Sequence, residues 1–331
     1  MTDPANGNFG LIYEYLGSFG LGPLDVPGGR VMADTTSLWV VEAFELWRNT
    51  GDAELLALLY PAASRAIRWQ INRARALGVP DHLVNTYDIT NPQIYNATTF
   101  NSVIYLTSLM VGAQLATAAG DGATAALAQA AYAVGVNATL SLLWNASAGY
   151  FSAFTGVPGS LHADCLYGQV LALYLLGPDA WHFPPAQVTA HLDAELACNG
   201  NPYGFTVVTG RSPTPAPVPP AVAHLSPARA RAAERVGAHV LDSTNWLGAA
   251  PTWSALQLVL GRLSTTAALD PTQRALDNFR TRLNDLWDFT GLTSGVWGTD
   301  SQNGQPHTTR CARVCAARRW ASVCVRAPAA L

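Results

Sequence analysis

Residues 97–143 read ATTFNSVIYLTSLMVGAQLATAAGDGATAALAQAAYAVGVNATLSLL, and Asp121 is the single charged side chain among them. The Gly120-Asp121 step is a typical break between helices, so the stretch predicts two helices, at about 97–119 and 122–143. The segment 96–119 is long enough to cross a bilayer, but its Asn, Gln, Thr and Ser side chains favour a helix buried in protein. We therefore expect a buried helix here and no transmembrane segment.

Helices also come in pairs on both sides of this stretch. Asp34-Thr35-Thr36 signals the start of a helix that runs to about residue 49, and a second helix follows Thr50-Gly51-Asp52, with Pro61 predicted to mark its first turn. Further helices are predicted at about 164–176, 185–197, 227–238, 247–261 and 271–286. Strand signals are weak outside 205–208. The pairing predicts an all-α fold, either a two-layer toroid with apolar inner and amphipathic outer helices or an open solenoid.

Composition narrows the class of protein. The chain has 331 residues, a net charge of −3 and only 12% charged residues, about half the globular average. This charge gives no reason to expect nucleic acid as a partner. The five cysteines show no zinc spacing, and we expect neither a metal nor a cofactor. The first residues lack the apolar core of a secretory signal, so the default expectation is a cytoplasmic or membrane-peripheral protein.

The candidate catalytic residue is Asp164, in the segment SLHADCLYGQ at 160–169. Between Asp88 and Asp164 the only charged residue is Asp121, and an apolar, charge-poor site favours the protonated carboxyl that a general acid needs. The alternative is that Asp164 is a helix N-cap. Nearby, His162 either tunes Asp164 or is solvated, and Cys165 is expected to be a small buried residue rather than a nucleophile.

Five short segments, in order, resemble one family. They are DTTSLWVVEAFELWRNTGD at 34–52, LYP at 59–61, NTYD at 85–88, LWN at 143–145 with Tyr150, and DCLYGQ at 164–169. Together they resemble glycoside hydrolase family 116, the non-lysosomal glucosylceramidase and bile-acid β-glucosidase group. The resemblance covers roughly residues 34–261.

The resemblance implies an (α/α)6 barrel that hydrolyses β-glucosides with retention, a carbohydrate or glycolipid substrate, and a preceding β-rich domain. It assigns the general acid/base to Asp164. Acids and aromatic rings commonly bind sugars, so Tyr87, Asp88 and Trp246 are candidate substrate contacts. The pair Tyr87 and Asp88 is equally consistent with a core tyrosine and an Asx-turn, and packing is the favoured role of Trp144 and Trp246.

The sequence also departs from the family. No segment carries the family's nucleophile motif, and the resemblance does not assign the nucleophile to Glu14. The segment DSTNW at 242–246 also lacks the glutamate that contacts the sugar in the family. We therefore expect an incomplete barrel whose nucleophile lies outside this chain. One alternative is an inverting α/α-barrel glycosidase with Asp88 or Asp34 as base, which requires carboxyl groups about 6.5–9.5 Å apart. The other is a non-catalytic sugar-binding or helical-repeat module.

The predicted organisation has three parts. Residues 1–33 are Gly- and aromatic-rich lead-in loops, and residues 34–309 are the catalytic domain, with a Pro-rich insertion near 211–227. Residues 310–331 form an Arg- and Cys-rich tail in which any amphipathic pattern stops. We interpret this tail as a frame or splice-boundary error in the gene model, or as a natural variant end.

Overall fold

The structure is a computed structural model that describes residues 10–12, 34–80, 97–155, 159–202, 204–209, 244–245, 249–290, 296–300 and 306–308. The described residues contain eight α-helices. They are α1 (Thr35–Thr50), α2 (Ala53–Arg73), α3 (Thr99–Ala118), α4 (Gly122–Leu143), α5 (Tyr167–Leu176), α6 (Pro185–Asn199), α8 (Ala249–Val259) and α9 (Thr265–Thr290).

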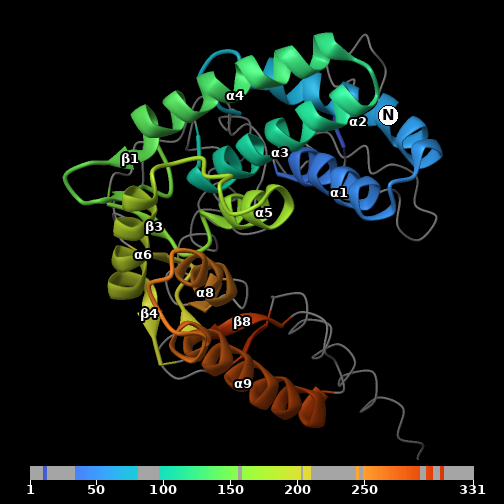
Figure 1. The fold of residues 1–331 in the computed structure, drawn as a ribbon. Helices are drawn as coiled ribbons and strands as arrows, with labels where there is room; N and C mark the ends of the chain where they lie inside the picture. Colours follow the sequence, from blue (N-terminus) through green and yellow to red (C-terminus); the bar gives the residue numbers. More distant parts are fainter. Residues whose placement is uncertain are drawn as a thin grey trace, which may run out of the picture.

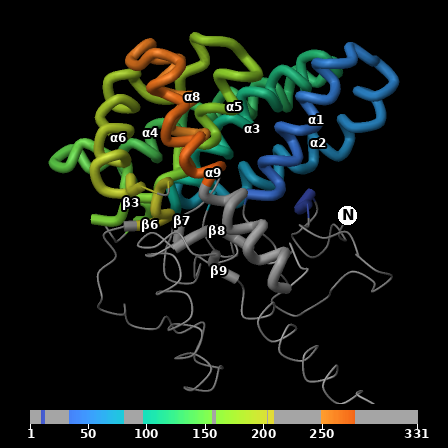
Figure 2. The backbone as a smooth tube through the Cα atoms, turned by 90° about the horizontal axis from the view of Figure 1, so that it is seen from below, coloured from blue at the N-terminus to red at the C-terminus, as the bar shows by residue number. Residues whose placement is uncertain are grey.

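The helices form two layers that follow an arc (Figure 1). Helices α1, α3, α5 and α8 contact one another in succession along the inner side, and α2, α4, α6 and α9 lie outside them. Figure 2 shows the same arc from a second direction. The all-α prediction is confirmed: the described residues form four successive helix pairs with the α/α-barrel arrangement, as an arc and not a closed ring.

The inner helices run parallel to one another, which brings their N-terminal ends together. At the C-terminal ends of these helices, the Arg48 guanidinium near the end of α1 donates a hydrogen bond to the Leu175 carbonyl near the end of α5. At the N-terminal ends, Phe100 in the first turn of α3 contacts the ring of His162, which lies just before α5. The segment that leads into α5, which holds Asp164, therefore lies among the starts of the other inner helices.

Helix α3 is the centre of the core. Its apolar side chains join two hydrophobic clusters, one with α5, α6 and α8 and one with α1 and α2. Several buried hydroxyl groups on it have hydrogen-bond partners inside the protein. Ser108 on α3 and Ser37 on α1 both donate to the Gln70 Oε1 atom of α2, at 2.9 and 2.6 Å. Because each hydroxyl has an acceptor, these polar groups can be buried without the cost of an unpaired donor.

Three predicted helix starts are wrong. Pro61 lies inside α2, which begins at Ala53 because Asp52 Oδ1 caps the amides of Glu54 and Leu55. Helix α5 begins at Tyr167, three residues after Asp164. Helix α9 begins at Thr265, six residues before the Pro271 that it contains. The predicted helix at 227–238 and the segments 13–33, 211–227 and 310–331 lie outside the described residues.

Short strands connect the helices. The antiparallel pairs are β1 (Trp144–Asn145) with β2 (Tyr150–Phe151), β3 (Leu161–His162) with β6 (Val208–Thr209), and β4 (Gly200–Asn201) with β5 (Gly204–Phe205). A three-stranded sheet joins β7 (Thr244–Asn245), β8 (Val296–Asp300) and β9 (Pro306–Thr308). The single strand predicted at 205–208 is divided between β5 and β6.

Helix α4 differs from the other outer helices. By length and composition it could cross a membrane, and only 22% of its most apolar window is buried. It packs along α3 as the outer member of a pair. Buried helices of globular proteins pass the same test of composition, so this feature leaves the prediction of no transmembrane segment untested.

Candidate functional site

Asp164 lies in the turn between β3 and α5 and is 6% exposed. It does not cap the helix through its side chain: the N-cap position of α5 is Leu166, without a side-chain hydrogen bond, while the Asp164 carbonyl accepts the Tyr167 amide at 3.1 Å. The N-cap interpretation of Asp164 is therefore wrong, because the chain makes a further turn before the helix starts.

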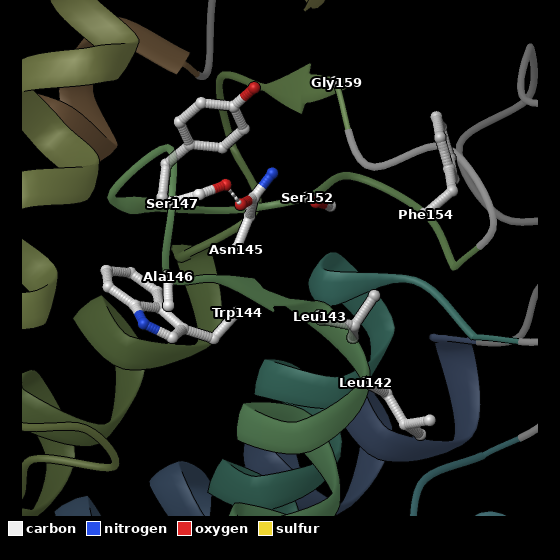
Figure 3. Close-up of a pocket in the computed structure, with 10 residues that line it drawn as sticks. Leu142, Leu143, Trp144, Asn145, Ala146, Ser147, Ser152, Phe154 and Gly159 are labelled. Carbon is white, nitrogen blue, oxygen red and sulfur yellow. Dashed lines mark hydrogen bonds between the residues drawn. The ribbon is translucent and has the colours of Figure 1, made fainter.

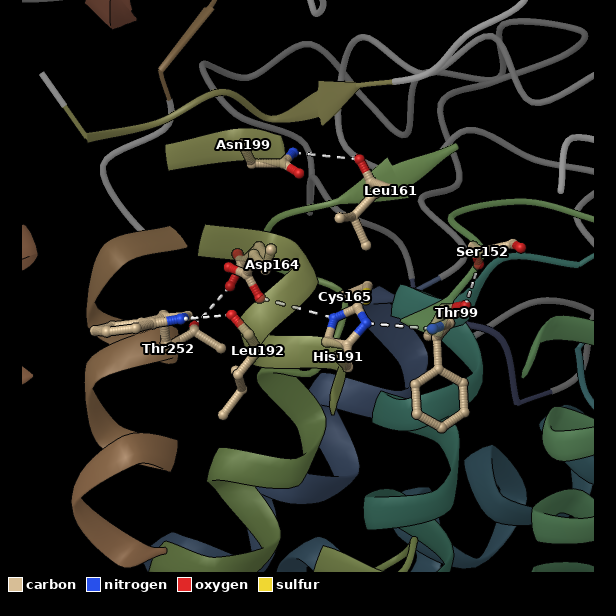
Figure 4. A network of polar contacts seen from close by, with 12 residues as sticks. Thr99, Ser152, Leu161, Asp164, Cys165, His191, Leu192, Asn199 and Thr252 are labelled. Atoms are coloured by element: carbon tan, nitrogen blue, oxygen red, sulfur yellow. Dashed lines mark hydrogen bonds and ion pairs between the residues drawn. The ribbon is translucent and has the colours of Figure 1, made fainter. Parts of the chain in front are cut away.

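The Asp164 carboxylate is held from a distant part of the chain. Thr252 Oγ1, in the first turn of α8, donates a hydrogen bond of 2.6 Å to Asp164 Oδ1 (Figure 4). The next residue, Trp253, donates from Nε1 to the Leu192 carbonyl of α6 at 3.0 Å. These two bonds tie α8 to α6 and to the start of α5, and a carboxylate anchored in this way keeps one orientation.

The rest of the DCLYGQ segment has structural roles. A Cβ atom on Gly168 would lie 2.5 Å from the Val103 carbonyl carbon and 2.6 Å from the Ile104 amide nitrogen, so only glycine lets α5 lie this close to the backbone of α3. Gln169 bridges the segment after α5, since its Nε2 donates to the Ala180 carbonyl and its Oε1 accepts the His182 amide. Gly168 and Gln169 thus hold α5 against α3 and against the segment that follows α5.

A buried polar cluster of Cys165, His191 and Glu195 lies beside Asp164. His191 Nδ1 accepts the Phe151 amide at 3.2 Å, so a neutral imidazole carries its proton on Nε2. That nitrogen is 3.3 Å from Cys165 Sγ and 3.7 Å from Glu195 Oε2. Burial, together with the charge of nearby His162, lowers the pKa of His191 to about 3, and the ring is neutral at physiological pH.

Cys165 is buried as expected, and the cluster is not a cysteine–histidine–acid triad. Burial raises the pKa of the Cys165 thiol well above its usual value, as do the charges of Glu195 and Asp164. In a nucleophilic triad the acid binds the ring nitrogen that faces away from the nucleophile. Here the thiol and the carboxyl group approach the same nitrogen of His191, so the ring cannot relay a proton between them.

Glu195 is the residue that sequence reasoning missed. Its pKa is raised well above the usual glutamate value, first by burial and then by the charge of Asp164, and this shift favours the protonated carboxyl group. Its Oε1 atom is buried without a hydrogen-bond partner. The available signal was the pair His191 and Glu195, four residues apart on the same face of a helix as the apolar Leu192.

His162 is buried, which contradicts the expectation of a solvated loop histidine. It belongs to β3 and packs edge-on against Phe100, with ring centroids 5.8 Å apart. Asp34 is also buried, directly before α1, with no side-chain capping bond. The other predicted site residues, Tyr87, Asp88 and Trp246, lie outside the described residues, so their roles stay predictions.

A cavity of about 620 Å³ opens beside the β1–β2 hairpin (Figure 3). It is lined by aromatic residues and by amide and hydroxyl groups, among them Trp144, Tyr150, Phe154, Asn145, Ser147 and Ser152. Trp144 also packs on Phe151, with ring centroids 4.9 Å apart, as the packing prediction requires. The lining does not include Asp164. Within the described residues, no group of three His, Cys, Asp or Glu side chains could hold a metal ion.

Comparisons with known proteins find similarity in solved structures alone. No family model matches the chain, and no curated protein sequence matches it significantly. A GH78 family rhamnosidase of Bacillus sp. GL1 has a TM-score of 0.47 and 15% identity over 85% of this chain and 24% of its own. The unsaturated glucuronyl hydrolase of Bacillus sp. GL1, responsible for the degradation of glycosaminoglycan, has a TM-score of 0.46 and 13% identity over 84% of this chain and 62% of its own.

The chain thus spans about a quarter of the first structure and less than two thirds of the second. Likenesses of this size do not assign a substrate or a reaction to it, and they do not single out glycoside hydrolase family 116.

Proposed function

We propose that this chain is the (α/α)-barrel part of a retaining β-glycosidase, acting on a β-glucoside or glycolipid, in which Asp164 is the general acid/base. The supporting observation is the state of Asp164: it is buried at the end where the inner helices begin, caps no helix through its side chain, and is oriented by Thr252 from 88 residues away. A general acid must be held in one orientation toward the leaving group, and the hydrogen bond from Thr252 holds the Asp164 carboxyl group in this way.

The chemistry divides between two carboxyl groups. In a retaining mechanism the acid protonates the leaving oxygen while a second carboxylate, about 5–5.5 Å away, attacks the anomeric carbon. The sequence resemblance assigns that second role to a glutamate motif that these 331 residues do not carry. Asp164 then removes a proton from the water that releases the sugar.

Chemical rescue tests the role of Asp164 without needing the nucleophile. Phenyl β-glucoside is incubated with the 331-residue chain and azide. We expect azide to attack the anomeric carbon from the opposite face, giving α-glucosyl azide, while Asp164 protonates the departing phenolate. Asp164→Asn should slow this reaction by about 10²–10⁴-fold, the usual contribution of a general acid. With 2,4-dinitrophenyl β-glucoside the loss should be small, because that leaving group needs no proton.

The matched control is Asp193→Asn, which removes an exposed acid of α6 that pairs with Arg262 at 2.8 Å. It should leave both reactions unchanged. An equal loss with the two leaving groups in Asp164→Asn, or no azide product from the wild-type chain, contradicts the proposal. Hydrolysis without azide would instead place a nucleophile or base within this chain.

The cavity at the β1–β2 hairpin supports a second candidate, a non-catalytic sugar-binding module. Aromatic rings beside amide and hydroxyl groups suit the apolar faces and hydroxyl edges of sugars. Binding of β-linked gluco-oligosaccharides, followed by calorimetry, distinguishes the two candidates. A module would lose binding in Asn145→Ala and keep it in Asp164→Asn, with no azide product in either case.

A further inference from the structure

Glu195 is a buried acid on the inward face of α6 to which the proposed reaction assigns no role. Glu195 is 1% exposed, and its carboxyl oxygen Oε1 has no hydrogen-bond partner. A buried polar atom without a partner is costly, since it loses its hydration and gains nothing in return. A hydrophobic residue at this position of α6 would avoid that cost, which makes the acid a candidate for a functional role.

The packing of α6 brings Glu195 to Asp164. One turn earlier on the helix, His191 reaches Cys165, the residue after Asp164, at 3.3 Å. The Leu192 carbonyl accepts Trp253 Nε1, and the neighbouring Thr252 binds Asp164. Figure 4 shows the hydrogen bond between Thr252 and Asp164, with His191 next to Cys165. Glu195 Oε2 lies 3.7 Å from His191 Nε2, the same nitrogen that approaches Cys165, so Glu195 and the Asp164-Cys165 step meet at one imidazole.

The charge that acts on Glu195 is the negative charge of Asp164. His191, the ion-pair partner of Glu195, is neutral, because burial holds the pKa of that ring at about 3. The other titratable groups of the elements packed against α6 are Asp164 and Cys165 before α5, His162 on β3 and Tyr150 on β2. Helix α8 contributes Thr252 and Trp253, which do not titrate. Two carboxyl groups in such a site resist ionising together.

We propose that Glu195 is a positioning residue for Asp164: the two carboxyl groups ionise as one coupled pair that retains a proton through neutral pH. The effect of this coupling on catalysis rests on the proposed function, because a retained proton keeps Asp164 able to protonate the leaving group. The coupled ionisation of the two carboxyl groups does not rest on the proposed function. Glu195 does not contact substrate in this arrangement and acts through Asp164.

Carbon-13 NMR of the full chain, labelled at aspartate side-chain carboxyl carbons, tests the coupling directly. The Asp164 signal is assigned by its loss in Asp164→Asn. In the wild-type chain this signal should change in two phases, one acidic and one above neutral pH, because the second carboxyl to ionise perturbs the first. In Glu195→Gln, which has the shape of the neutral acid, the phase above neutral pH should be lost. Glu195→Asp should restore it.

Asp193→Asn is the matched control on the same helix, and it should leave both phases in place. A single-phase Asp164 titration in the wild-type chain overturns the proposal and requires no variant to fold. Two phases that persist in Glu195→Gln also overturn it, since another group would then be the partner.

The azide reaction separates this proposal from the proposed function. If both hold, Glu195→Gln moves the alkaline limit of the azide reaction and leaves its rate near pH 6 within about twofold, since the pair still supplies an acid there. If Asp164 is not a catalytic acid, the two-phase titration remains while the azide reaction is indifferent to Asp164→Asn. The two failures therefore give different results.

Discussion

Helices α3 and α4 follow each other in the chain, and neither contains a charged side chain, yet they have opposite environments. Sixteen of the 20 residues of α3 are buried, against six of the 22 residues of α4. Figure 1 shows the reason: α3 lies between α1 and α5 in the inner layer, while α4 covers it from outside. The sequence predicts amphipathic outer helices, and α4 departs from this prediction because alanine fills much of its exposed side.

The difference shows that lack of charge does not determine burial. What separates the two helices is side-chain size. The buried side of α3 carries large residues such as Ile104, Tyr105 and Leu109, whereas α4 is rich in alanine. Large apolar side chains recover more free energy on burial, since the gain scales with the apolar area removed from water. The inner position therefore belongs to the helix with more area to bury.

Replacing a leucine by alanine on each of the two helices tests this difference in burial most directly. Leu109 of α3 is 0% exposed and Leu127 of α4 is 38% exposed. Leu109→Ala should lower the free energy of unfolding by about 2–5 kcal/mol, because a cavity remains where the side chain was. Leu127→Ala should cost about 1 kcal/mol or less. Urea unfolding followed by circular dichroism measures both, and equal losses would show that α4 is covered in solution.

Adding one methyl group tests how closely the two layers are packed. Gly168→Ala places a Cβ against the backbone of α3, which cannot rotate away, and should cost about 1–3 kcal/mol. Gly122→Ala, at the start of α4, meets nothing within 4 Å and should be neutral or stabilise by up to about 1 kcal/mol. Differential scanning calorimetry of the two variants gives the comparison. A neutral Gly168→Ala would mean that α5 and α3 are less closely apposed than described.

His182 joins the two helices and makes their pairing sensitive to acid. Its ring lies 2.8 Å from Thr107 Oγ1 of α3 and 3.2 Å from the Tyr132 hydroxyl of α4, and burial lowers its pKa to about 3. Between pH 6.5 and 3 the unfolded chain binds a proton that the folded chain excludes. Stability therefore falls as the pH is lowered through this window, by roughly 1.4 kcal/mol per pH unit for each such histidine.

His191 has the same lowered pKa, so both rings contribute to this acid sensitivity. His182→Gln should remove about half of the slope that the two rings contribute, whatever it does to stability at pH 7. The measurement is the free energy of urea unfolding at several pH values from 7 to 4. An unchanged slope in His182→Gln would show that this histidine is protonated or solvated in the folded chain.

Local sequence signals located most of the helices but fewer of their starts. Gly51 follows α1 directly and Gly120 lies two residues after the end of α3. Both have a positive φ, which glycine adopts most readily, and this is why glycine followed by aspartate marks the ends of these helices. The start of α5 was predicted three residues early, because Asp164 has the chemistry of an N-cap residue. Its side chain binds Thr252 of α8 instead, a contact that no local rule contains.

The sequence by itself determined that the chain forms paired helices, that the helix predicted at 97–119 is mostly buried, and that Asp164 is an acid in a charge-poor segment, since periodicity, charge and glycine punctuation act over a few residues. Only the tertiary structure decided the surroundings of Asp164. Glu195 and Thr252 lie 31 and 88 residues further along the chain, and they reach it because α6 and α8 pack at the same end of the arc. Burial there removes water from Glu195 and His191, and this loss of solvation makes their protonation unusual.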